Sequence, residues 1–457
     1  MNSLHELAAK ILPQAPEIQV NGAVLAFASA VSVTTALVFG ALPALRASRP
    51  ALERELRTGY RGAGGGRGAG RGGLVIAEVT LALVLVVTAG LLTRSLRGML
   101  RADPGFATRH LLALTLIVPT HRYPERPQYL EVYHRMLAEL AAVPGVESVA
   151  SMKTPPLAGP AGVESLAFRG EGRPEPAAAE EPRASWHPVS RGFFRTLGIP
   201  LLAGRDFDPR DGAGAPEVAA VNRALAQRYF PGEDPVGRTI RVGDRELQIV
   251  GLVGDARLAS IVEAAQPTVF LHQEQFPRRV FTFLLRTRGA PEDLMEAARK
   301  AIWRVDAEQP VERLAPLGRI VSDSLARPRL VASLVGLFAA LALVLAAVGV
   351  YGVMSYAVGR RTHEIGVRMA LGADGLRVLG EVMAQGGRWV LVGVALGLAL
   401  ALAISRLLGS LLYGLSAADP LTFAAAAAAL TVVALAACLL PARRAATTDP
   451  LAALREG

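Results

Sequence analysis

The sequence predicts a multi-span α-helical membrane protein that carries one large mixed α/β (α+β) domain outside the membrane. Of its 457 residues, 51% are hydrophobic and only 19% are charged, against about 25% charged in soluble domains. The hydrophobic residues gather in five long, charge-poor stretches, and arginines crowd at the ends of these stretches. That distribution is typical of membrane spans, so the net charge of +10 does not indicate a nucleic-acid-binding protein.

Each apolar stretch is long enough to cross a bilayer, which takes about 20 residues. Five buried helices of a soluble protein are disfavoured, because soluble helices seldom run this long without a charge. Glu78 and Arg406 are the charges in or beside the stretches, and both are expected near an end, which argues against an ion pathway. The stretches are Ile18–Leu45, Gly72–Thr93, Leu330–Gly359, Trp389–Ser405 (extended by Leu407–Tyr413) and Pro420–Ala442.

The arginines predict the topology. The connection 43–72 carries seven arginines, the connection 360–388 carries five, and the tail after the last span carries three. The short segments on the opposite side contain only one basic residue, Lys10. Because short cytoplasmic loops are enriched in Lys and Arg, we expect these three segments and the C-terminus to be cytoplasmic, with the N-terminus and residues 94–328 outside.

An internal repeat links the first span to the last. Residues 42–59 and 440–457 are identical at eight of eighteen positions, and each follows an apolar span on the cytoplasmic side. We therefore expect a parallel repeat, in which the first span is the last helix of one unit and the chain ends with the last helix of a second unit. The segment GAGGGRGAGRGG (62–73) is interpreted as a flexible linker and not as a dinucleotide-binding loop, because no strand precedes it.

The outside region alternates between strand-like and helix-like patterns. Its Ser165–Ala184 segment, rich in Pro, Glu and Ala, is expected to be a surface loop. Three segments are expected to be helices: Tyr129–Val143, Arg223–Tyr229 and Ala290–Val305. Six are expected to be strands: Leu111–Val118, Val146–Ser151, Glu217–Asn222, Thr239–Val242, Glu246–Gly254 and Val280–Arg286.

Signatures of catalysis and of cofactor binding are missing from these 457 residues. The three lysines follow no glycine, so there is no phosphate-binding G-x-x-x-x-G-K-[ST] loop, and the seven histidines form no metal-ligand pair. Asp206, Asp208 and Asp211 could suggest calcium, but they lack the glycine and the final Glu of an EF-hand loop, and a solvated turn is favoured. The single cysteine, Cys438, excludes an internal disulfide.

The loop 359–388 has the sharpest functional pattern. Ile365, Met369 and Leu376 give it an apolar face, and acidic and basic residues give it a charged face. It could be an amphipathic helix at the lipid headgroups or a docking helix for a cytoplasmic partner. In the fourth span, Gly393 and Gly397 form a G-x-x-x-G pair that suits close helix packing, with a second copy of the chain as one alternative partner.

Several segments resemble FtsX/MacB-type ABC transporter permeases, and most closely the duplicated permeases without a fused ATPase. The segment RTHEIGVRMALGA (361–373) is similar to the hallmark segment of that family, and LVIAEVTLALVLVVTAGLLTRSL (74–96) resembles the span that opens a second unit. The resemblance in the outside domain, which would then be periplasmic, lies in RGFFRTLGIPLLAGRDF (191–207), VNRALAQRYFPGEDPVGRTI (221–240) and IVGLVGDAR (249–257). Against the family plan, the chain lacks most of a first unit and looks N-terminally truncated.

The resemblance implies a non-catalytic permease subunit of the bacterial inner membrane that binds no cofactor itself. A separate cytoplasmic ATPase would hydrolyse ATP and bind through the loop 359–388, and the motion would reach the periplasmic domain to export or extract a substrate. A homodimer or a second permease unit is implied as a further partner. The implied ATPase contacts are Glu364, Ile365, Gly366, Arg368, Ala370 and Gly372.

Two alternatives differ from this expectation. One is an FtsX-like regulator that acts on a periplasmic partner such as a cell-wall hydrolase, and the other is a membrane-anchored periplasmic sensor without an ATPase. The expected organisation is an outside segment (1–17), the last span of a first unit (18–45), a cytoplasmic Arg/Gly-rich linker (46–73), a span (74–93), the periplasmic domain (94–328), a span (329–358), the coupling loop (359–388), two spans (389–413 and 420–441) and a cytoplasmic tail (442–457).

Overall fold

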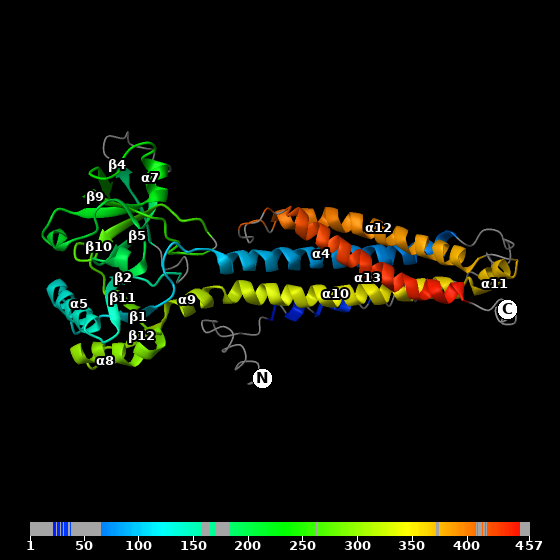
Figure 1. The fold of residues 1–457 in the computed structure, drawn as a ribbon, viewed down its shortest axis with the longest axis horizontal. Helices are drawn as coiled ribbons and strands as arrows, with labels where there is room; N and C mark the ends of the chain where they lie inside the picture. The colour runs from blue at the N-terminus through cyan, green and yellow to red at the C-terminus, as the bar shows by residue number, and fades with distance from the viewer. Residues whose placement is uncertain are drawn as a thin grey trace. The chain divides into compact units, whose positions relative to one another are not determined.

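A computed structural model describes residues 65–447, apart from 158–163, 171–181, 262, 372–373, 408, 410–413, 415 and 417, together with single positions between 22 and 37. Several expected segments lie outside these residues: the segment 1–17, most of the first span 18–45 and most of the linker 46–73. The first copy of the repeat (42–59) and the second copy from residue 448 onward lie outside them as well. The described chain divides into two compact units, a membrane unit and a second unit at Arg97–Ala326 (Figure 1).

The membrane unit contains four described helices that are long and apolar enough to cross a bilayer. These are α4 (Gly65–Arg101), α10 (Ala326–Gly359), α12 (Gly375–Leu407) and α13 (Pro420–Ala446). A short helix, α11 (Thr362–Ala370), connects α10 to α12. The helices pack around a common apolar core that includes Val79, Leu83, Val350, Leu430 and Cys438.

The described helices extend beyond the apolar stretches that mark them in the sequence. α12 begins at Gly375, inside the expected coupling loop, and α11 is the one described helix between α10 and α12. Likewise, α4 begins at Gly65 within the expected glycine-rich linker and continues to Arg101. Hydropathy reports how deep a residue lies in the bilayer, whereas a helix can continue into water as long as its backbone hydrogen bonds are made.

The second unit is built on one twelve-stranded mixed sheet. Its order is β12-β1-β11-β2-β5-β10-β7-β9-β8-β4, while β3 pairs with β5 and β6 pairs with β9. The strands are β1 (Leu111–Ile117), β2 (Val146–Met152), β3 (Glu164–Ala167), β4 (Arg169–Gly170), β5 (Arg183–Val189), β6 (Leu201–Gly204), β7 (Val218–Asn222), β8 (Thr239–Val242), β9 (Arg245–Val253), β10 (Thr268–His272), β11 (Val280–Thr287) and β12 (Val311–Pro316).

Two separate apolar cores lie along this sheet. The first packs α5 (Arg126–Ala141) and α8 (Met295–Val305) against β1 and β11, with Met136 and Phe283 fully buried. The second gathers around β5, β7, β9 and β10 with α7 (Arg223–Tyr229), where Leu225 and Ile249 are fully buried. The remaining helices are α6 (Phe193–Leu197), α9 (Leu317–Ser324) and the 3-10 turns η2 (Pro209–Asp211) and η3 (Pro291–Leu294).

Two expectations for this unit are corrected. The described ends of the expected surface loop Ser165–Ala184 are strands: β3 pairs with β5, β4 pairs with β8, and β5 begins at Arg183. The expected helix Ala290–Val305 begins with the 3-10 turn η3, and the α-helix α8 starts only at Met295. In the first case, pairing with β5 and β8 outweighs the loop-like local composition.

Candidate coupling and packing sites

The helix α11 begins directly after α10 and carries charges suited to its ends. Glu364 lies in its first turn and Arg368 in its last, where each complements the helix dipole. The two side chains form an i,i+4 ion pair with an N–O distance of 2.6 Å, and Arg368 also reaches Glu381 of α12 at 3.3 Å. These contacts hold α11 beside the first turns of α12 while both partners stay about half exposed.

The opposite face of α11 is buried within the membrane unit. Ile365 packs with Val378 of α12 and Ala445 of α13, and Val358 and Met369 surround this contact. A side chain at Gly375 would meet the carbonyl oxygen of Ala446 at 2.9 Å, so the start of α12 lies directly against the end of α13. The inner ends of α10, α12 and α13 therefore form a base on which α11 is seated.

The structure separates the six residues expected to contact an ATPase. Glu364, Arg368 and Ala370 are exposed, Ile365 and Gly366 are buried against their own chain, and Gly372 lies outside the described residues. Val367 and Leu371, which the sequence analysis did not select, are exposed at 37% and 83%. Their i,i+4 spacing places them on one face of a helix, and this spacing is the sequence signal that indicates them. We name Glu364, Val367, Arg368 and Leu371 the α11 surface.

Gly393 and Gly397 of α12 lie against α4 of the same chain. A Cβ atom at Gly393 would meet the Cβ atom of Val79 at 2.8 Å, and one at Gly397 would meet the Cβ atom of Leu83 at 3.0 Å. The Thr80 hydroxyl also donates a hydrogen bond of 3.1 Å to the Gly393 carbonyl. The G-x-x-x-G pair is thus occupied by α4, and it is not available to a second copy of the chain.

Glu78 of α4 contacts a neighbouring helix of the membrane unit. Its carboxylate contacts the backbone of α10 at Gly349, so closely that no Cβ atom would fit there. Gly349 is ten residues before the end of α10 at Gly359, which corresponds to about 15 Å along a helix. Along α4, Glu78 is six residues from the inner end of the span at Gly72, and the described residues offer it no ion pair.

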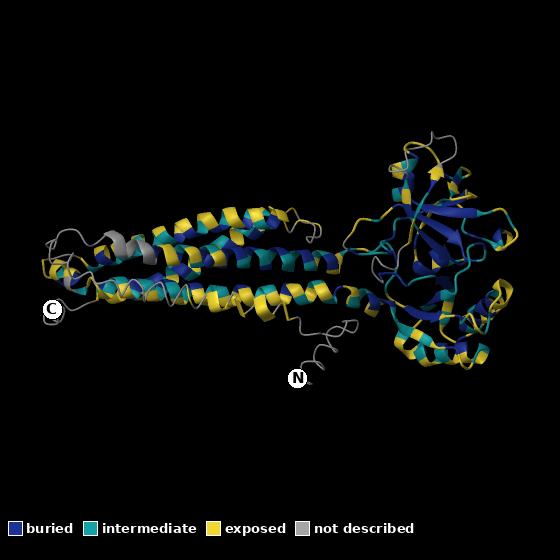
Figure 2. Ribbon diagram, turned by 180° about the vertical axis from the view of Figure 1, so that it is seen from behind, coloured by how far each residue is buried: buried dark blue, intermediate teal, exposed yellow. Residues whose placement is uncertain are grey.

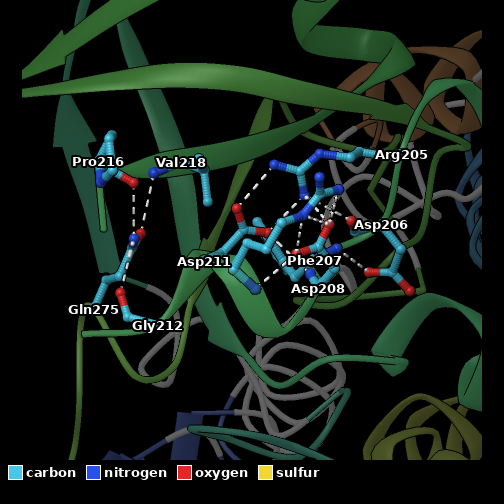
Figure 3. Close-up of polar contacts among 10 residues, drawn as sticks. Arg205, Asp206, Phe207, Asp208, Asp211, Gly212, Pro216, Val218 and Gln275 are labelled. Atoms are coloured by element: carbon cyan, nitrogen blue, oxygen red, sulfur yellow. Dashed lines mark hydrogen bonds and ion pairs between the residues drawn. The ribbon is translucent and has the colours of Figure 1, made fainter. Parts of the chain in front are cut away.

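The acidic group Asp206, Asp208 and Asp211 is a closed turn, as Figure 3 shows. Arg205 grips the buried Asp211 carboxylate with two hydrogen bonds of 2.6 and 2.8 Å, and the Asp208 amide donates a third of 2.9 Å. Asp208 caps η2 through the Arg210 amide. No cluster of potential metal ligands occurs among the described residues, and the Asp211 carboxylate is instead engaged by Arg205 and the Asp208 amide.

The ion pair between Arg205 and Asp211 is expected to stabilise the periplasmic unit. Burial alone would raise the pKa of the Asp211 carboxyl, but the Arg205 guanidinium and the Asp208 amide offset burial and hold this pKa below its usual value. Arg205→Ala removes a charge-assisted pair from a buried carboxylate and is expected to lower the free energy of unfolding by about 2 kcal/mol. Arg210→Ala, which removes an exposed arginine beside Asp208, is the control and is expected to cost less than about 0.5 kcal/mol in the same denaturant series.

Comparison with known proteins identifies the family. The family model of the MacB-like periplasmic core domain matches residues 73–304, and that of the FtsX-like permease C-terminal region matches residues 336–450. The chain therefore belongs to the FtsX/MacB-type ABC transporter permeases. It is a multi-span membrane protein whose α+β unit is periplasmic, which confirms the expected fold class and location.

The chain is similar to curated exporters over more than half of its length. It is 28% identical over 311 residues to the macrolide export ATP-binding/permease protein MacB of Chromobacterium violaceum, covering 63% of this chain and 48% of that protein. It is 28% identical over 276 residues to the pyoverdine export ATP-binding/permease protein PvdT of Pseudomonas aeruginosa, covering 57% and 41%. The chain thus spans less than half the length of these relatives.

Among solved structures, the periplasmic region of MacB from Actinobacillus actinomycetemcomitans is similar at 12% identity. That comparison covers 49% of this chain and 96% of the solved chain, with a TM-score of 0.34. The extracellular domain of the noncanonic ABC-type transporter YknZ from Gram-positive bacteria matches at 14% identity, covers 42% and 91%, and has a TM-score of 0.29.

Proposed function

We propose that this permease transmits the ATP-driven motion of a separate cytoplasmic ATPase to its periplasmic domain, for export or extraction of a substrate of unknown identity. The observation that carries the proposal is the α11 surface, which presents two charges and two apolar side chains to the cytoplasm from a buried base. Within these 457 residues there is no phosphate-binding loop, so in this proposal ATP is bound and hydrolysed outside them. The named relatives are described as ATP-binding/permease proteins, which supports ATP as the energy source of the motion.

A second feature supports transmission. The α4 helix runs without a break from the membrane unit to Arg101, beyond the point where the periplasmic unit begins at Arg97. Its packing against Gly393 and Gly397 couples α4 to α12, and α12 begins beside α11. A displacement of α11 by a partner would therefore be carried through a rigid helix contact to α4 and so to the start of the periplasmic domain.

The test uses the full chain in lipid nanodiscs and an ABC ATPase of the MacB or LolD type. We expect the permease to bind the ATPase and to stimulate its ATP hydrolysis. In Glu364→Ala/Arg368→Ala, binding should weaken at least tenfold, because the charged half of the α11 surface is removed while the buried face remains. The affinity is measured by surface-immobilised nanodiscs and the hydrolysis rate by phosphate release.

The matched control is Arg241→Ala/Glu246→Ala, which removes an exposed ion pair of the same kind, with an N–O distance of 2.5 Å, from the periplasmic unit. This control should bind the ATPase as the unchanged chain does. Equal affinities for both double variants would refute the assignment of the α11 surface. Stimulation of ATP hydrolysis together with capture of a cell-wall hydrolase, and no transport, would favour the FtsX-like regulator instead.

A further inference from the structure

Among the described residues, the cytoplasmic end of the membrane unit carries more arginines than acidic residues. Residues 359–388 and 443–444 together hold seven arginines and three acids. Two of the acids, Glu364 and Glu381, are both engaged by Arg368, and the third, Asp374, accepts a hydrogen bond from the Leu376 amide. Four exposed arginines make no ion pair with any described acid: Arg360, Arg377, Arg388 and Arg443.

One of these arginines ends an apolar stripe on α10. Leu345, Val348, Gly352 and Tyr356 follow one another at helical spacing toward Arg360, and all are exposed. Figure 2 shows exposed residues along most of α10. A Cβ atom at Gly352 would have no neighbour within 4 Å, so this position is an open notch between Val348 and Tyr356. A chain of methylene groups could approach the helix backbone there.

We propose that the inner end of α10 binds an anionic phospholipid, with its phosphate at Arg360 and one acyl chain in the notch at Gly352. The phosphate would meet a guanidinium that has no acidic partner among the described residues, which favours an anionic over a zwitterionic headgroup. The nearby arginines at the ends of α12 and α13 add attraction of the same sign. The site lies at the cytoplasmic leaflet, because α10 runs inward from the periplasmic domain.

A helix of a second copy is the other occupant that an apolar stripe could take. The charge of Arg360, which pairs with no acid among the described residues, decides between the two. A second copy would place the same Arg360 and its basic neighbours beside this end and so add repulsion. A bilayer supplies the required combination of a negative headgroup and a long apolar chain. A soluble anion would supply the negative charge but no apolar chain.

The experiment is native mass spectrometry of the full chain in detergent, with three added probes. These are dioleoyl-phosphatidylglycerol, dioleoyl-phosphatidylcholine with the same chains, and glycerol phosphate as a headgroup without chains. We expect phosphatidylglycerol to be retained at least fivefold more than either other probe, since each arginine at the surface contributes roughly a fivefold preference. Equal retention of both lipids, or glycerol phosphate retained as well as phosphatidylglycerol, would overturn the proposal.

Two variants test the two parts of the site. Arg360→Gln should reduce phosphatidylglycerol retention about fivefold, and Gly352→Leu should reduce retention by filling the notch. Arg406→Gln, which removes an exposed arginine at the opposite end of α12, is the control and should leave retention unchanged. An equal loss in Arg360→Gln and Arg406→Gln would show non-specific charge attraction, and loss of a dimer mass in Gly352→Leu would assign the stripe to a second copy. A thermal unfolding midpoint equal to that of the unchanged chain verifies that each variant is folded.

Discussion

Gly393→Leu is expected to lower the free energy of unfolding of the membrane unit by about 3 kcal/mol. The backbone of α12 touches α4 at this point, and the first atom of any side chain would already lie 2.8 Å from the Cβ and Cγ1 atoms of Val79 and 3.1 Å from the Ile76 carbonyl oxygen. Because Val79 is fully buried and the carbonyl belongs to the α4 backbone, neither can move aside. The two helices must separate to admit leucine.

Separation of the helices also breaks the hydrogen bond from the Thr80 hydroxyl to the Gly393 carbonyl. The helix propensity of the new residue has the opposite effect on stability, because leucine is more favourable than glycine in a helix by roughly 1 kcal/mol. A net loss of stability would therefore report the cost of disrupting the contact between α4 and α12. The measurement is denaturant unfolding of the purified full chain in detergent micelles, followed by far-ultraviolet circular dichroism.

Gly387→Leu is the matched control on the same helix, because a Cβ atom at Gly387 meets nothing within 4 Å. This variant should unfold at the same denaturant concentration as the unchanged chain or at a higher one. If Gly393→Leu is as stable as Gly387→Leu, the contact between α4 and α12 is not the one described. If Gly393→Leu instead dissociates a dimer and leaves the monomer stable, the glycine pair serves a second copy.

The membrane helices could be located from the sequence, but their ends could not. Uncharged stretches mark bilayer crossings because any charge in hydrocarbon is costly. The same reasoning ended the expected coupling loop at Arg388, whereas α12 already begins at Gly375. Charged residues such as Arg377 and Glu381 exclude the membrane and do not exclude a helix, so helix ends depend on capping and on packing against neighbours.

The α11 surface could be predicted in part. The charged residues Glu364 and Arg368 follow from the pattern of the loop, and both are exposed as a docking role requires. Ile365 and Gly366 belong to the buried face instead, because Val378 and Ala445 come from helices distant in the sequence. Packing against these distant helices decides which apolar residues of a short helix face inward. In α11 it buries Ile365 and leaves Val367 and Leu371 exposed.

The periplasmic sheet shows the same limit. Strands with strong alternation, such as β9 at Arg245–Val253, could be recognised locally. β3, β4 and β6 are short strands, of two to four residues, that exist through pairing with β5, β8 and β9. A segment of this length carries too little local preference to indicate a strand, and its partner is set by the fold of the whole unit.

Asp419→Ala is expected to lower the free energy of unfolding by about 3 kcal/mol, because one carboxylate serves three donors. Asp419 caps α13: its Oδ2 atom accepts hydrogen bonds from the Thr422 amide at 3.1 Å and the Thr422 hydroxyl at 2.5 Å. The same oxygen pairs with Arg94 of α4 at 2.5 Å. Nearby, the Thr422 methyl group lies 2.7 Å from where a Cβ atom at Gly90 would be, so α4 and α13 are locked together at their outer ends.

Two further variants divide this effect. Asp419→Asn keeps a good helix cap and loses the charge, so it should cost about 1 kcal/mol. Arg94→Ala should cost no more than about 1 kcal/mol, because the Arg94 side chain is 42% exposed and solvent weakens the pair. Combining Arg94→Ala with Asp419→Asn should add little to either, since both remove the same ion pair. Additive losses would show that the two residues act independently.

Acid provides a separate measurement of the same contact. The Thr422 hydroxyl and amide and the Arg94 guanidinium hold the pKa of Asp419 below its ordinary value of 3.8, against the opposing effect of burial. A carboxyl with a lowered pKa in the folded protein stabilises the fold fully above its ordinary pKa, and this stabilisation is lost as the pH falls through the lowered value. The stability difference between the unchanged chain and Asp419→Asn should therefore stay constant from pH 7 to pH 5 and shrink below about pH 4. A difference that already shrinks between pH 7 and pH 5 would mean that Asp419 is not the ionised cap that joins α13 to α4.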